Sequence, residues 1–471
     1  MSSLSALDSL LSGSSSSSSS INLSQILEAA MGASSEGIDV NSAVSAAVSA
    51  AEAPENTWES QETTLENQAT ALNQIQTDAT NLDNDMLALN NLTGPLSAST
   101  VSSSDSDIAT ATAASGTASG NHTVEVTSLA TTASWTSGTF SSSSTDLPAG
   151  SFTITNGSGT STTITTDGSE TLSDVASEIN NDDLGVTADV VTDATGSRLA
   201  IVANTSGSAA NFTVSSSDSS TFGFSQAATG TNAALTVDGI SISSASNTVT
   251  GVIPGLTIDL VGASAGTSVS LTVAPDTSQA STAINQFVTD YNTLVQALNT
   301  QFTDSGSGEG VLATDPNVRN LQSDLEGSLG YTPASGSTSA VSSLASLGIS
   351  VNSDGTLTVD SSTLNSALGN NFSDVQTFFQ GAALNGFANS LNQQLTNFIS
   401  PSDGAFTLDL QSIGTQESTL KTDISNFQTN VIAPLQTQLQ SEYSQAEILL
   451  QQLPTEMKQI DEELGENNSS N

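Results

Sequence analysis

The residue types that most often carry out chemistry are rare in this chain. Its 471 residues include one histidine, four lysines or arginines, and no cysteine. His122 begins a stretch of alternating polar and apolar residues, which indicates a solvent-facing strand position rather than a catalytic base. Ser–His–Asp and Cys–His catalysis are therefore excluded, as are disulfides and thiolate metal sites.

Pairs of carboxylates are the remaining candidates for a chemical site. Asp182 with Asp183, or Asp105 with Asp107, could bind a cation or act as a glycosidase acid and base. The chain has 48 acidic residues, so such pairs arise by chance, and we interpret them as solvated surface groups. No glycine-rich run lies between a strand and a helix, as a phosphate-binding loop requires. We expect no enzyme, no metal site and no cofactor.

The charge balance limits the classes of partner. The formal net charge is −44, although only 11% of the residues are charged. Such a scarcity of lysine and arginine argues against binding to nucleic acid or to an anionic membrane surface. No apolar run reaches about 18 residues, so no membrane span is predicted. The first residues lack the basic segment and apolar core of a cleavable signal peptide, so an exported chain would leave by another route.

The hydrophobic period changes along the chain and predicts helices at both ends. Residues 1–35 are serine-rich and are expected to form a disordered tail, with a short helix around Ile21–Met31. Residues 36–98 have a helical period, which Pro54 interrupts before a long helix from about Thr57 to Leu92. Short strand-like runs dominate residues 99–275, with one embedded helix at "TLSDVASEINN" for which Thr171 or Ser173 is the expected N-cap. Helical periodicity then returns, except for a hairpin at "LGISVNSDGTLTVD".

Heptad repeats mark both helical ends. The N-terminal seam comprises Trp58, Leu65, Leu72, Ile75, Leu82, Met86 and Leu89, and Gln61 and Gln68 weaken its first part. The C-terminal seam comprises Leu439, Tyr443, Leu450, Leu453, Met457, Ile460 and Leu464, with helix breaks expected at Pro434 and Pro454. We therefore expect a multidomain α+β fold. Its terminal helices would pair as a coiled-coil stalk, with antiparallel β head domains inserted between them.

Several stretches resemble the flagellar filament capping proteins, the hook-associated protein 2 family. At the N-terminal end these are "GIDVNSAVSAAVSAAEAP" and the heptad helix after it. Further along, they are "NTVTGVIPGLTIDL", "GVLATDPNVRNLQSDL", "LGISVNSDGTLTVD" and the ending "LQQLPTEMKQIDEELG". The segment "TLSDVASEINNDDLGVTADVVTDATGSRLAIVAN" is similar to the flagellin hook IN motif, which other axial flagellar proteins share. The resemblance covers about residues 36–465, in the family's order.

The resemblance implies a domain plan. Residues 36–98 would be N-terminal leg helices. Residues 99–130 with 233–275 would form a β domain, into which 131–232, with the IN-like motif, would be inserted. Residues 276–383 would be a helical domain with a small hairpin, and 384–471 a C-terminal coiled-coil leg with a polar end.

The resemblance also implies a function. The family caps the distal end of the bacterial flagellar filament, retains exported flagellin, and promotes its folding and insertion at the tip. Expected partners are further copies in a homo-oligomeric ring of roughly five, flagellin, the hook–filament junction protein and a cytoplasmic export chaperone. The expected location is secreted, at the filament tip, without a cleavable signal peptide.

Two alternatives stay open beside the cap. Another axial protein, at the hook–filament junction or as a minor flagellin, would also have the IN motif but would lack the "VIPGLTIDL" to "INQFVTDYN" connection. A tip adhesin would contact host glycans through exposed loops of residues 99–275. Trp135, Phe222 and Phe224 are the aromatic residues there that could provide a platform for sugars.

Overall fold

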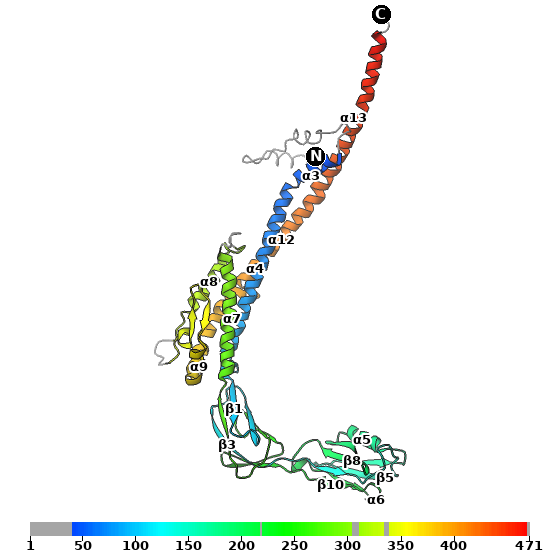
Figure 1. Ribbon diagram of the computed structural model, residues 1–471, viewed down its shortest axis with the longest axis vertical. Helices are drawn as coiled ribbons and strands as arrows, with labels where there is room; N and C mark the ends of the chain where they lie inside the picture. Colours follow the sequence, from blue (N-terminus) through cyan, green and yellow to red (C-terminus); the bar gives the residue numbers. More distant parts are fainter. Residues whose placement is uncertain (1–39, 217–218, 304–309, 334–338, 469–471) are drawn as a thin grey trace. The chain divides into compact units, whose positions relative to one another are not determined.

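The computed structural model describes residues 40–216, 219–303, 310–333 and 339–468 (Figure 1). The expected tail and the helix around Ile21–Met31 lie outside the described residues. Contacts divide the chain into two compact units. The first combines Met1–Asn81, Thr293–Leu325 and Gln394–Asn471, and the second combines Leu82–Asn292 and Glu326–Gln393. The first unit consists of helices and the second of helices and antiparallel sheets, which confirms the α+β class.

The first unit is helical. Its helices are α3 (Val40–Ala51), α4 (Ala53–Asn90), α7 (Thr277–Phe302), α8 (Pro316–Ser328), α11 (Phe387–Ile399), α12 (Ala405–Phe427) and α13 (Ala433–Asn468), and parts of α4, α7, α8 and α11 belong to the second unit. Pro54 occupies the first turn of α4, where a proline is tolerated. Asp315 caps α8, since its Oδ1 accepts from the backbone N–H of Asn317 at 2.8 Å. No described helix has an apolar stretch long enough to cross a membrane.

The β strands of residues 99–275 belong to two separate hydrophobic cores. One core lies among a five-stranded sheet, β1 (Ser99–Ser103), β15 (Val269–Pro275), β3 (Gly120–Ser128), β11 (Ala233–Val237) and β12 (Ile240–Ser244), and a three-stranded sheet, β13 (Thr248–Thr250), β14 (Leu256–Leu260) and β2 (Ala109–Ala113). All neighbours in these sheets are antiparallel. Along β15, Val269, Leu271 and Val273 are buried, whereas the alternate Ser270 and Thr272 are exposed. This is the alternation expected of a strand with one covered face.

The second core lies within residues 131–232. Its sheets are β10 (Ser225–Ala228), β4 (Ser134–Thr136), β8 (Gly196–Ala203) and β7 (Val186–Asp193), and then β6 (Ser161–Thr166), β5 (Gly150–Thr155) and β9 (Thr213–Ser216). Helix α5 (Leu172–Asn181) contributes Val175 and Ile179 to this core, and α6 (Ser219–Phe222) contributes Phe222. Thr171 forms a capping box with Asp174 at the start of α5, so the first of the two expected N-caps is correct.

The helical part of the second unit has an aromatic core. It contains α9 (Ser361–Asn370), α10 (Phe372–Gln380) and the hairpin of β16 (Ile349–Val351) and β17 (Leu357–Val359), besides parts of α4, α7 and α11. Short 3₁₀ turns lie at η1 (Pro95–Ser97), η2 (Ser208–Ala210) and η3 (Leu344–Leu347). Phe287 on α7 stands edge-to-face on Phe387 of α11 at 5.7 Å. Asn292 exchanges two hydrogen bonds with the backbone of Leu357, which attaches the hairpin to α7.

Candidate assembly surface on the terminal helices

Helices α4 and α12 run antiparallel within the first unit (Figure 1). Trp58, near the start of α4, stands edge-to-face on Phe427 at the end of α12, with ring centroids 5.4 Å apart. Further along, Gln76 donates to the hydroxyl of Thr407 at 3.2 Å. Residue numbers therefore rise along α4 where they fall along α12, as in an antiparallel pair. The two helices come from opposite ends of the chain.

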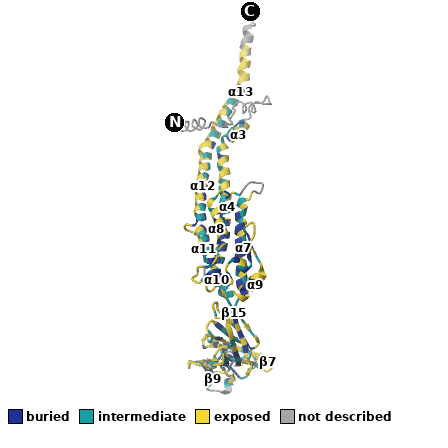
Figure 2. Cartoon of the chain, turned by 90° about the vertical axis from the view of Figure 1, so that its left-hand side faces the viewer, coloured by how far each residue is buried: buried dark blue, intermediate teal, exposed yellow. Residues whose placement is uncertain are grey.

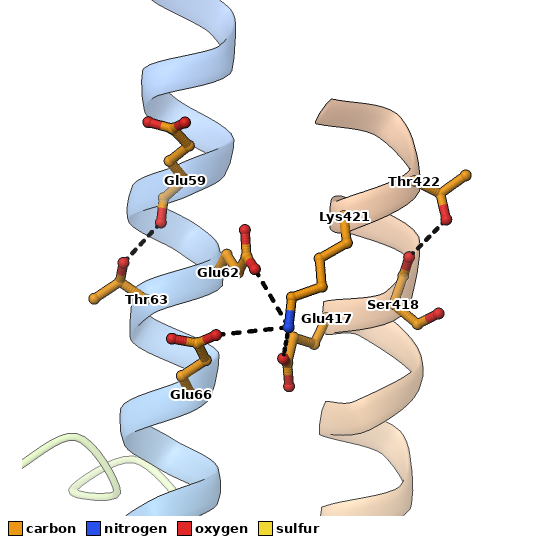
Figure 3. Close-up of polar contacts among 8 residues, drawn as sticks. All are labelled: Glu59, Glu62, Thr63, Glu66, Glu417, Ser418, Lys421 and Thr422. Carbon is orange, nitrogen blue, oxygen red and sulfur yellow. Dashed lines mark hydrogen bonds and ion pairs between the residues drawn. The ribbon is translucent and has the colours of Figure 1, made fainter. Parts of the chain in front are cut away.

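A single lysine joins the acidic faces of these two helices (Figure 3). Lys421 Nζ lies 3.4 Å from a carboxylate oxygen of Glu62 and 3.6 Å from one of Glu66, and it also pairs with Glu417 on its own helix. The hydrogen bond to Glu417, followed by that to Glu62, raises the pKa of Lys421 above its usual value. This ammonium supplies the positive charge that the three carboxylates would otherwise take from a solution cation.

The N-terminal seam is covered to different degrees along α4. Leu72, Ile75, Leu82, Met86 and Leu89 are at most 1% exposed. Trp58 and Leu65 are half-buried. Leu65 lines an open groove together with Leu420 and with Gln61, one of the two glutamines expected to weaken this part of the seam.

Helix α13 packs against α3 over its first turns. Val44 and Val48 form a small cluster with Ile432, and Leu439 and Tyr443 pack partly buried against it. Near the junction with α12, Glu55 of α4 is 6% exposed and accepts a hydrogen bond from Gln428. The first two residues of the C-terminal seam are therefore in contact with the N-terminal part of the described chain.

The next four residues of the C-terminal seam are exposed along α13 (Figure 2). Exposed fractions are 44% for Leu450, 47% for Leu453, 61% for Met457 and 55% for Ile460. Ile448 and Leu449 are exposed as well, and the side chain of Leu464 is outside the described residues. We name Leu450, Leu453, Met457 and Ile460 the α13 stripe. Contiguous exposed apolar residues of this kind typically mark interaction sites.

The N-terminal and C-terminal helices pair as expected, but the two heptad seams do not cover each other. The partner of α4 is α12, which precedes the C-terminal seam, and the partner found for α13 is α3. The reason is that a heptad repeat defines an apolar face of a helix but does not name the helix that covers it.

Of the two expected helix breaks, the one at Pro434 coincides with an interruption of the α-helix, whereas the one at Pro454 is wrong. Pro434 follows the π-helical turn Gln428–Ile432 (η4), in which Ala433 N–H donates to the carbonyl of Gln428. A π turn moves the preceding carbonyls away from the proline ring, so the helical path continues with a shifted register. Pro454 lies inside α13, which does not end there. The carbonyl that loses its partner belongs to the exposed Leu450, where water can replace the missing N–H.

Sequence reasoning missed the role of Lys421. The pair of Glu417 and Lys421, four residues apart, is a local signal of helix stabilisation. Its contacts with Glu62 and Glu66 depend on the tertiary pairing of α4 with α12 and have no local signal.

Three family models match the chain. Residues 36–133 match the model described as flagellar hook-associated protein 2 N-terminus, and residues 230–455 match the corresponding C-terminus. Residues 151–205 match the flagellin hook IN motif. The two hook-associated models together cover more than half of the chain.

Curated proteins and solved structures show the same likeness. The B-type flagellar hook-associated protein 2 of Pseudomonas aeruginosa is 30% identical over 246 residues, which are 50% of this chain and 49% of that protein. Flagellar hook-associated protein 2 of Salmonella typhimurium is 34% identical over 149 residues, 30% of this chain and 31% of its own. The matched regions thus span about half or less of these relatives. The crystal structure of the flagellar cap protein FliD D1-D2-D3 domains from Escherichia coli is similar at 27% identity and a TM-score of 0.59, over 73% of this chain and 99% of that one.

Proposed function

The chain belongs to the flagellar hook-associated protein 2 family, and from this we propose that it caps the distal end of a bacterial flagellar filament. In this role it retains exported flagellin and promotes its folding and insertion at the tip. The observation that carries the proposal is the fold, which resembles the cap protein of Escherichia coli over 99% of that solved chain.

The proposed partners follow from the same role. The chain forms a homo-oligomeric ring, receives flagellin beneath it, and is exported to the filament tip. A cytoplasmic chaperone and the hook–filament junction protein are further proposed partners. The α13 stripe supports this part of the proposal, because an exposed apolar helix face gains stability by packing on apolar surface of other axial subunits. The domain boundaries expected from the sequence belong to the same proposal.

The cap role requires no catalysis, which agrees with the structural role of the family. In the single histidine, His122, the Nδ1 atom lies 2.8 Å from Oδ2 of Asp238. The carboxylate of Asp238 also accepts a hydrogen bond from the backbone N–H of Thr123 at 2.8 Å. The pair therefore joins β3 to the turn between β11 and β12. This arrangement gives His122 a structural partner.

The aromatic residues considered for glycan contact are used in packing. Phe222 is 3% exposed, and Trp135 and Phe224 pack partly buried against the same core. Trp135 Nε1 donates to the carbonyl of Phe212 at 2.9 Å. A flat aromatic platform for sugars is therefore not offered by these three side chains, and no observation favours the adhesin over the cap.

A clean deletion of the gene tests the proposal. We expect electron microscopy to show hooks without filaments, and we expect flagellin monomer in the medium, because subunits that arrive without a cap diffuse away. Restoring the gene should restore the filaments. Intact filaments with normal motility would overturn the cap proposal and favour a minor axial subunit or an adhesin.

A further inference from the structure

Two carboxyl groups face each other within the second unit. Asp85 lies on α4 and Asp290 on α7, and their side chains are within hydrogen-bonding reach. Helix α4 leads through η1 into β1, and α7 follows directly on β15. The two aspartates therefore join the chain segments that enter and leave the strands of residues 99–275.

One carboxyl oxygen of Asp85 lacks a hydrogen-bond donor. Its Oδ2 is shielded from solvent and has no hydrogen-bond partner among the described residues. Asp290 accepts from Gln286 Nε2 at 3.0 Å, on its own helix. A bare carboxylate oxygen that faces a second carboxylate is unfavourable, because like charges repel and neither group can donate while both are ionised.

No basic side chain neutralises this pair. The guanidinium of Arg319 donates to the carbonyl of Ala313 and stacks over Phe302, and Lys421 is held by its three glutamates, all in the first unit. Arg198 lies on β8 and Lys458 on the exposed part of α13. These four are all the lysines and arginines of the chain.

The other ionisable groups placed near this part of α4 and α7 add no positive charge. Asp83 accepts from Asn392 of α11 at 2.6 Å, and burial raises its pKa. Burial, followed by the charge of Glu326, raises the pKa of Tyr291, so its phenol stays neutral. A proton is therefore the neutralising group that this site can obtain.

We propose that Asp85 and Asp290 hold one proton between them across α4 and α7, and that this shared proton fastens the two helices until the pH rises above neutrality. The proton stays with Asp85 as a hydroxyl that donates to the Asp290 carboxylate, and at higher pH it leaves to water. Burial, with additions from the hydrogen bond and charge of Asp290, raises the pKa of Asp85 to about 7. An aspartate in an unfolded chain titrates near pH 4, at about 3.9.

The sign of the pH effect follows from this difference. Between about pH 4 and about pH 7 the folded chain binds more protons at this site than the unfolded chain does. The stabilising contribution is therefore complete below about pH 4, declines as the pH rises toward about 7, and is lost above that value. Between about pH 4 and about pH 6, the opening equilibrium of the α4–α7 contact should change by up to about tenfold per pH unit, and the dependence becomes weaker close to neutrality.

Hydrogen exchange on the full chain tests the proposal. Backbone protection is measured for peptides that cover residues 82–90 and 284–292 at pH 6 and pH 8, after correction for the intrinsic exchange rate. We expect protection in the native sequence to fall about tenfold between these pH values. In Asp85→Asn, whose amide donates to Asp290 at either pH, the protection should be the same at both. Glu59→Gln, at an exposed position of α4, is the matched control and should behave like the native sequence.

A second measurement covers the case in which Asp85→Asn does not fold. Infrared difference spectra of the native chain between pH 6 and pH 8 should show loss of one protonated carboxyl band, and Asp290→Asn should alter its position. Absence of that band, or equal pH dependence of protection in the native chain and in Asp85→Asn, would overturn the proposal.

Discussion

The apolar seams of α4 and α13 share their spacing but differ in burial. Leu72, Ile75, Leu82, Met86 and Leu89 are at most 1% exposed, whereas the α13 stripe is 44% exposed at Leu450 and 61% at Met457. The α4 seam is covered by segments of this chain, and one of them, α10, donates from Gln380 to the carbonyl of Leu89. The same heptad pattern therefore stabilises the folded chain on α4 and remains available for a partner on α13.

The largest expected difference between the seams is in the cost of truncation. Leu89→Ala should lower the local free energy of opening in the second unit by about 2–5 kcal/mol, because it leaves a cavity. Leu453→Ala should change the local free energy of opening of α13 by less than about 0.5 kcal/mol, since the side chain of Leu453 is already in water. Hydrogen exchange of the two helices checks both values. Equal costs at the two positions would show that the two seams do not differ in burial in solution.

A helix-stabilising substitution at Pro454 tests whether α13 needs a weak point in its exposed part. Pro454→Ala restores an N–H that can donate to the carbonyl of Leu450, and proline in an exposed helix interior costs about 3 kcal/mol relative to alanine. The free energy of opening for α13 amides around this position should rise by up to about 3 kcal/mol. The diameter of swarming colonies should shrink if release of the cap needs a weak helix. Unchanged motility with a more stable helix would remove any role for Pro454 in cap movement.

The aromatic contact between α4 and α12 is expected to have an intermediate effect. A double-mutant cycle of Trp58→Ala and Phe427→Ala should give a coupling of about 0.5–1.5 kcal/mol, typical of an edge-to-face pair. Hydrogen exchange of the backbone amides of α4 near Trp58 in the four variants measures this coupling. A coupling of zero would show that the two helices separate at this end in solution.

The smallest expected effect belongs to Lys421. Lys421→Gln leaves Glu62, Glu66 and Glu417 without their ammonium, so the variant should lose thermal stability at low salt. The loss should disappear near about 1 M salt, where screening is nearly complete at these distances. Lys458→Gln, on the exposed part of α13, is the matched control. An identical salt dependence in the two variants would contradict the role given to Lys421.

Local features of this fold could be predicted from the sequence. Asp315 before Pro316 and Thr171 before "LSDVASEINN" both cap helices, because an N-cap depends on neighbouring residues alone. The hairpin at Ile349–Val351 and Leu357–Val359 follows from its Asp-Gly turn in the same way.

Features that depend on distant residues could not be predicted in this way. The partner of α4, the contacts of Lys421 and the meeting of Asp85 with Asp290 each join positions far apart in the chain. The passage of α13 through Pro454 depends on solvent exposure, which no local pattern gives.

We expect the α13 stripe to act at the filament tip rather than in the fold of the chain. The most direct test complements a deletion strain with Leu453→Asp/Met457→Asp and, as a matched control, with Gln451→Asp/Thr455→Asp, which adds the same charges at exposed positions of the same helix. Circular dichroism and secretion should be unchanged in both. The account predicts hooks without filaments and flagellin in the medium for the stripe variant, and normal filaments for the control. Normal filaments with both variants would contradict it.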